Sequence, residues 1–296
     1  MPHVQHGASG SFGPVLLTIM LVLTALIYLR GWVLLRSNSL SRIPAWRACS
    51  FLVGLFLIWI AVASPLSALD QELLTAHMLK HLLLMTVAPP LIWLGEAVRA
   101  CSQALLRFLR ARPVAFCWPV SIWTMERSFL RPEVCWLSSA AALVGWHIPA
   151  VFTLAMQSQG WHFVEQSSFV VTGLLFWWPV VQPWPSVLRP DLSMILYLFF
   201  ATLPCDLLSG FLVFCDRVVY PVYLSSSNVL GFTALADQQC AAALMWTCVT
   251  VVYLVAGAVL AMRLLSPRNF RNHEFAHPDL DVRAVPRSVR QRLEAF

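Results

Sequence analysis

The sequence predicts an all-α integral membrane protein that crosses the bilayer seven times, with its N-terminus outside and its C-terminus in the cytoplasm. Charged residues make up only 11% of the 296 residues and hydrophobic residues 59%, whereas a soluble domain is typically about 25% charged. The mean hydropathy of +0.71 also indicates the membrane class. Long apolar runs and a one-sided distribution of basic residues are the other two observations behind this prediction.

Each of the seven apolar runs has about the 20 residues that an α-helix needs to cross the hydrocarbon core. In order, the runs are residues 12–35, 46–64, 73–95, 134–156, 163–181, 192–214 and 239–265. A further apolar piece, 113–123, is too short to span and contains Pro119, so we expect it to be interfacial or re-entrant. Residues 1–265 are then one membrane domain, followed by a basic cytoplasmic tail over 266–296 that we expect to be partly disordered.

The basic residues give the predicted orientation. If the seven runs alternate in direction, 18 of the 20 Lys and Arg residues fall on one side of the bilayer, and only Lys80 and Arg217 fall on the other. The positive-inside rule places the basic side in the cytoplasm, which puts the N-terminus outside. The basic residues are spread over loops without interleaved aromatics, so the net charge of +6 does not indicate nucleic-acid binding.

With this topology, residues that could bind a metal gather at the outer ends of several runs. His77, His81 and Met85 follow one another at intervals of four and therefore share one face of a helix. The fourth and fifth runs bring His147 and His162 to the same depth. Residues placed to support these candidate ligands are Glu165, Gln166, Asp206, Asp237 and Gln238. Each has an ordinary structural explanation by itself, but histidines from three helices at one depth favour a metal or cofactor site.

The residue types leave more than one cofactor open. Imidazole with thioether suits copper, especially Cu(I), and imidazole with carboxylate also suits zinc. Histidines on facing helices could instead ligate haem axially. The sequence has no HExxH motif of a zinc protease, and its only lysine, Lys80, is not in the last run, where a retinal Schiff base would need it.

Four stretches carry a resemblance to a known family. In order they are "HMLKHLLLMTVAPPLIWLG", "GWHIPAVFTLAM", "WHFVEQSSFVVTGLLFWWPV" and "ADQQCAAALMW", and they cover about residues 73–246. With them the sequence resembles the seven-helix CtaG-type cytochrome c oxidase assembly factors, which are distinct from the single-span copper chaperone that shares the name. The resemblance implies a non-enzymatic assembly factor for a respiratory haem–copper oxidase in the bacterial inner membrane. It also implies that the protein binds or relays copper at the outer face, with oxidase subunits and a periplasmic copper chaperone as partners.

One position departs from the family pattern. The motif residues that match by position are His77, His81, His147, His162, Glu165, Asp237 and Gln238. The family usually has a second histidine directly after the glutamate, and here that position is Gln166. Glutamine is a poor copper ligand, so either the site has one fewer nitrogen or this position only supports the ligands.

The sequence leaves two alternative functions and one possible disulfide open. The alternative functions are a haem-bearing membrane electron-transfer protein and a copper transporter. Whether Cys215 and Cys240 pair is also undecided.

Overall fold

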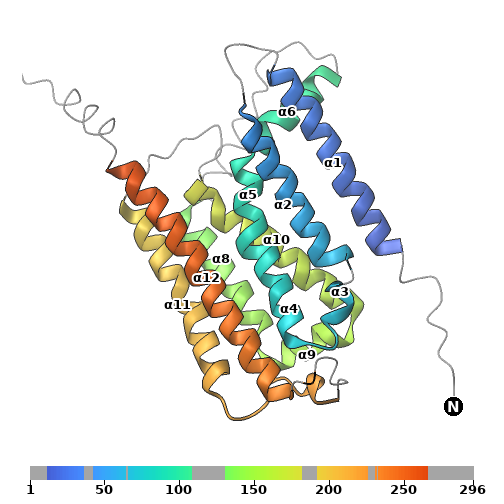
Figure 1. Ribbon diagram of the computed structural model, residues 1–296, viewed down its shortest axis with the longest axis vertical. Helices are drawn as coiled ribbons and strands as arrows, with labels where there is room; N and C mark the ends of the chain where they lie inside the picture. The colour runs from blue at the N-terminus through green and yellow to red at the C-terminus, as the bar shows by residue number, and fades with distance from the viewer. Residues whose placement is uncertain are drawn as a thin grey trace, which may run out of the picture.

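The computed structural model describes residues 12–36, 43–64, 66–108, 131–181, 192–225, 231 and 233–265, and every regular element in these ranges is a helix (Figure 1). The predicted all-α class is confirmed for this part of the chain. The predicted interfacial piece 113–123 and the predicted tail 266–296 lie outside the described residues.

The longest of the described helices are apolar, and shorter ones lie at their ends or at breaks within them. In chain order they are α1 (Phe12–Arg36), α2 (Ala45–Ala63), α3 (Leu66–Leu69), α4 (Leu74–His81), the π-helical segment η1 (Leu82–Val87), α5 (Ala88–Leu94), α6 (Ala97–Phe108), α8 (Pro132–Trp146), α9 (Pro149–Gln157), α10 (Gln159–Val181), α11 (Leu192–Phe214), the 3-10 helix η2 (Pro221–Ser225) and α12 (Ala234–Leu264).

Five helical stretches among the described residues are long and apolar enough to cross a membrane: α1, α2, the continuous stretch Leu74–Leu94, α11 and α12. The pair α8–α9 makes a sixth if it counts as one span, bent by 76°. Helix α10 has 23 residues, but its first two turns carry polar side chains, and it is not in this set. The structure therefore supports five to six spans, and both a seventh span and the orientation of the termini remain predictions.

Helix α12 begins earlier than the apolar run that predicts it, at Ala234 rather than at residue 239. The hydroxyl of Thr233 accepts a hydrogen bond from the backbone N–H of Ala236 at 3.2 Å and so caps the helix. Asp237 and Gln238 consequently lie in the first turns of α12, where both are buried.

The long helices pack side by side, with α1 and α2 on one flank, α11 and α12 on the other, and α4, α5 and α10 between them (Figure 1). The starts of α4 and α12 meet at one end of this bundle, because the carboxylate of Asp237 accepts hydrogen bonds from the backbone N–H groups of Leu74 and Thr75 at 2.6 and 3.2 Å. At the same end, the hydroxyl of Tyr223 donates to the carbonyl of Asp70 at 2.8 Å.

A glycine lets α10 approach the middle of the Leu74–Leu94 stretch closely. A Cβ atom at Gly173 would lie 2.8 Å from the carbonyl oxygen of Met85 and 2.9 Å from its Cα. Side chains larger than hydrogen would therefore push the two helices apart. By contrast, only 11% of the residues in the apolar 18-residue window of α1 are buried, as expected for a helix whose apolar side chains contact lipid.

Candidate metal centre

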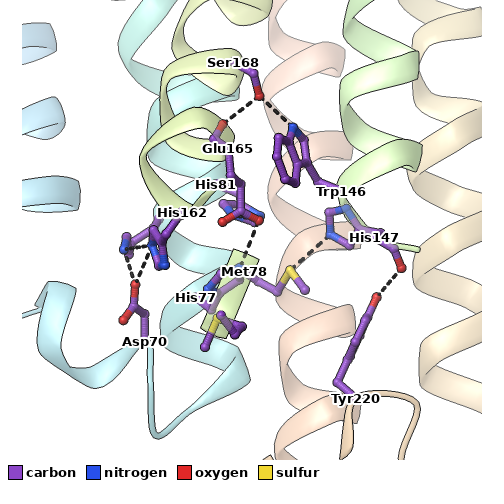
Figure 2. Close-up of polar contacts among 12 residues, drawn as sticks. Asp70, His77, Met78, His81, Trp146, His147, His162, Glu165, Ser168 and Tyr220 are labelled. Carbon is purple, nitrogen blue, oxygen red and sulfur yellow. Dashed lines mark hydrogen bonds and ion pairs between the residues drawn. The ribbon is translucent and has the colours of Figure 1, made fainter. Parts of the chain in front are cut away.

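Three buried side chains converge where α4 and α10 pack together. His77 and His81 come from α4 and Glu165 from α10, and one possible ligand atom from each lies within 4.8 Å of the other two (Figure 2). The Nε2 atoms of His77 and His81 are 3.6 and 3.4 Å from Oε1 of Glu165. The three side chains are at most 5% exposed. The histidine pair predicted from its four-residue spacing thus faces a carboxylate of another helix.

Most polar atoms of this group lack a hydrogen-bond partner. Among the described residues, neither ring nitrogen of His77 has one, nor does Nδ1 of His81, nor does either carboxylate oxygen of Glu165. An unsatisfied buried polar group costs about 1–3 kcal/mol, and a charged group costs more. A cation bound between the three side chains would satisfy the carboxylate and one nitrogen of each ring at once. The donor set therefore fits a metal ion.

The local backbone positions the two histidines. The segment η1 starts directly after His81, and the backbone N–H of Ala88 bonds to the carbonyl of Leu83, five residues earlier. Such π-helical turns occur often at functional sites. Pro89 follows, and it has no N–H with which to restore the regular α-helical pattern. This widened turn and the close approach of α10 at Gly173 help to place Glu165 next to the histidine pair.

Two phenylalanine rings pack against the histidines of this group. The ring of Phe152 is 4.9 Å from the ring of His77, and the ring of Phe169 is 4.2 Å from the ring of His81, measured between centroids. Both phenylalanines are at most 1% exposed. They exclude water from the group, which strengthens any electrostatic interaction inside it.

His147 lies close to this group but points elsewhere. Its ring centroid is 5.8 Å from that of His81. Its Nε2 is 3.3 Å from Sδ of Met78, and its Nδ1 is 2.6 Å from the carbonyl oxygen of Leu143 (Figure 2). The sequence analysis placed His147 among the ligands but did not single out Met78, because one methionine in an apolar helix is ordinarily core.

His162 belongs to a neighbouring cluster of charges. Its Nε2 is 3.3 Å from Oδ2 of Asp70 and 3.1 Å from Nζ of Lys80, and Lys80 forms an ion pair with Asp70. Burial by itself raises the pKa of Asp70, but the contacts with His162 and Lys80 outweigh it and hold that pKa below its ordinary value. The ring of His162 is 5.9 Å from that of His77, so this cluster borders the candidate centre.

Asp70 and Lys80 were not among the predicted site residues. Both are only 1% exposed. A signal was present for Lys80, since a lysine between two histidines inside an apolar run needs a buried partner. Asp70 lies just before that run and carries no such signal.

The remaining predicted residues occupy different places. Met85 is buried and lines a small cavity together with His81. Gln166 is half-buried next to Glu165, and Oδ1 of Asp206 is buried on α11 without a partner among the described residues. None of these three belongs to the converging group.

Two residues of α12 that were predicted to support the site form hydrogen bonds to backbone groups. Asp237 binds the start of α4, as described above. The amide of Gln238 accepts from the N–H of Val219 at 2.7 Å and donates to the carbonyl of Arg217 at 3.1 Å, which fixes the loop between α11 and α12. Cys215 and Cys240 are both free.

A family model described as "cytochrome c oxidase caa3 assembly factor (Caa3_CtaG)" matches residues 26–266. The match includes every member of the converging group and the neighbouring charge cluster. Neither a curated protein nor a solved structure matches the chain.

Proposed function

The chain belongs to the family of cytochrome c oxidase caa3 assembly factors, and we propose that it serves this assembly by binding copper between His77, His81 and Glu165. The observation that carries the proposal is the convergence of three buried ligand atoms within 4.8 Å that lack other partners. Two imidazoles and a carboxylate form a common transition-metal donor set. The protein's role in this proposal is to hold or pass on the ion, and it is non-catalytic.

Copper is preferred over zinc for two reasons. Cytochrome c oxidases contain copper, so copper is a cargo that the assembly of such an enzyme needs. The surroundings also offer soft sulfur donors, because Met78 contacts His147 and Met85 and Cys205 line the cavity beside His81. Thioether and thiolate ligands favour Cu(I).

The two alternative functions receive less support. A haem between these histidines would need the space that Phe152 and Phe169 fill against the imidazole rings. A copper transporter would need polar residues along the whole of its path, whereas α5, which continues the histidine-bearing stretch, has the sequence APPLIWL.

We further propose that the site lies toward the outside of a bacterial inner membrane. The basis is the 18 to 2 division of basic residues under the positive-inside rule. In this orientation a periplasmic copper chaperone reaches the site from its own compartment, and oxidase subunits receive the ion. Alkaline phosphatase fused after Ser158 should be active, and after Arg110 inactive; the reverse pattern would refute the orientation.

The function is tested in cells that depend on this chain for oxidase assembly. His81→Gln keeps a polar group of similar reach, so the protein should still insert in the membrane. Oxidase activity per unit of inserted protein should fall in copper-poor medium and recover in part with added copper. The matched control is His273→Gln, the same change outside the residues that the family model matches. Normal activity of the His81 variant in copper-poor medium would refute the proposal.

A further inference from the structure

The two contacts of the His147 ring cannot both be satisfied by a neutral imidazole. Nδ1 of His147 is 2.6 Å from the carbonyl oxygen of Leu143, and Nε2 is 3.3 Å from Sδ of Met78 (Figure 2). A carbonyl oxygen and a thioether sulfur both act only as acceptors. Each ring nitrogen therefore needs a hydrogen, or another positive centre, between itself and its neighbour.

A neutral imidazole carries one hydrogen, on one nitrogen. If the hydrogen is on Nδ1, it bonds the carbonyl of Leu143, and the lone pair of Nε2 faces the lone pairs of the sulfur. If the hydrogen is on Nε2, the lone pair of Nδ1 faces the carbonyl oxygen at 2.6 Å. The second arrangement is the worse one, because its two acceptors are closer and the oxygen carries more negative charge. Of the two neutral forms, the contacts therefore favour the Nδ1–H tautomer, which aims an open lone pair at Met78.

Two positive centres could lie between Nε2 and the sulfur, a proton or a metal ion. Protonation would turn the His147 ring into an imidazolium. His147 is only 4% exposed, and Met78 beside it is fully buried. Either positive centre places a unit charge in these buried surroundings, which is costly, and for a proton the only return is a hydrogen bond to a thioether, which is a weak acceptor. A soft monovalent ion instead uses both lone pairs as ligands, and imidazole with thioether is a donor pair that suits Cu(I).

We propose that His147 and Met78 form a second, softer copper position that binds Cu(I) beside the His77–His81–Glu165 centre. Metal–nitrogen and metal–sulfur bonds are about 2.0 and 2.3 Å long in protein sites, so two atoms 3.3 Å apart can both reach one ion. The inference rests on the proposed function for the identity of the cargo. The pair itself rests on the geometry of His147.

The fold brings the two partners together from different helices beside the first centre. His147 is the C-cap residue that follows α8, and the bend before α9 turns its ring inward. The hydroxyl of Tyr220 donates to the carbonyl of His147 at 3.0 Å and fixes this break in the span. Met78 comes from α4, directly after His77, and the rings of His147 and His81 are 5.8 Å apart. An ion that moves between the positions exchanges an imidazole–carboxylate set for an imidazole–thioether set without leaving the buried layer.

The test uses the purified full-length protein, anaerobic Cu(I) with a competing chelator, and X-ray absorption at the copper edge. Wild-type protein should show sulfur among its copper ligands. Met78→Leu keeps the side-chain volume nearly unchanged but should remove that sulfur signal. It should also lower the Cu(I) affinity of one class of site by at least about 10- to 100-fold. Removing a supporting partner of a metal ligand already causes a loss of this size. The matched control, Met194→Leu, alters another buried methionine, and should change neither quantity.

The outcomes separate this inference from the proposed function. An unchanged sulfur signal and Cu(I) affinity in Met78→Leu would overturn the second position while leaving the first intact. Loss of all copper from the His77→Gln/His81→Gln double variant would also overturn it, because the two positions would then be one site. Retention of the sulfur-ligated copper in the double variant supports it. If that variant keeps all wild-type copper, the proposed function fails and the second position stands.

Discussion

Asp237 should stabilise the start of the histidine-bearing helix from another helix. Residue Leu73, at the N-cap of α4, provides no side-chain cap. Instead, Oδ2 of Asp237 accepts from the N–H of Leu74 at 2.6 Å, and Oδ1 accepts from the N–H and the hydroxyl of Thr75 at 3.2 and 2.6 Å. The carboxylate also lies at the positive end of the α4 dipole. Replacing it by alanine removes these bonds together.

The cost can be worked out from these contacts. A hydrogen bond to a charged group contributes about 1.5–3 kcal/mol, and a buried N–H left without a partner costs about 1–3 kcal/mol. Leu74 is 2% exposed, so water does not replace its lost acceptor, whereas Thr75 is half-buried and regains part of its loss. We therefore expect Asp237→Ala to lower the free energy of unfolding by about 2–4 kcal/mol.

Equilibrium unfolding in mixed micelles, followed by tryptophan fluorescence, measures this difference. Hydrogen exchange should rise first in residues 74–77, because the loss begins at the start of α4. Asp216→Ala is the matched control, since Asp216 is an exposed aspartate in the loop before η2. Equal losses in the two variants would refute the capping role of Asp237.

Two further predictions concern the packing and the charges around the centre. Gly173→Ala places a Cβ 2.8 Å from the carbonyl oxygen of Met85, so it should cost about 1–3 kcal/mol in the same unfolding assay. At Gly145 a Cβ meets nothing within 4 Å, and Gly145→Ala should be neutral or stabilising by up to about 1 kcal/mol. Lys80→Met leaves the buried Asp70 without its cation and should cost about 3–5 kcal/mol. Adding Asp70→Leu should recover much of that loss, and failure to recover it would show that the ion pair does not dominate this cluster.

The sequence predicts the position of the helices along the chain better than the direction in which their side chains point. Apolar runs locate α1, α2, α11 and most of α12, because each run must be about as long as the bilayer is thick. The four-residue spacing places His77 and His81 on one face. Which residue of another helix faces that pair depends on how the helices rotate and pack. For that reason Glu165 was predicted only as a supporting residue, although the structure sets it against both rings.

The places of His147 and His162 show the same limit. Both lie beside the histidine pair, but the bend between α8 and α9 turns His147 toward Met78, and His162 contacts the Asp70–Lys80 ion pair. Neither a 76° bend nor a partner outside the apolar run follows from hydropathy. The early start of α12, likewise, depends on the Thr233 cap rather than on the apolar pattern.

The central claim is that His77, His81 and Glu165 together hold copper, and the copper content of the purified protein tests it most directly. Wild-type protein, Glu165→Gln and the His77→Gln/His81→Gln double variant are purified from copper-replete cells without added metal, and copper per chain is measured by mass spectrometry. We expect wild-type protein to retain copper, Glu165→Gln to retain less, and the double variant to lose the ion held at this centre. A double variant that is correctly inserted and carries the same copper per chain as the wild type would contradict it.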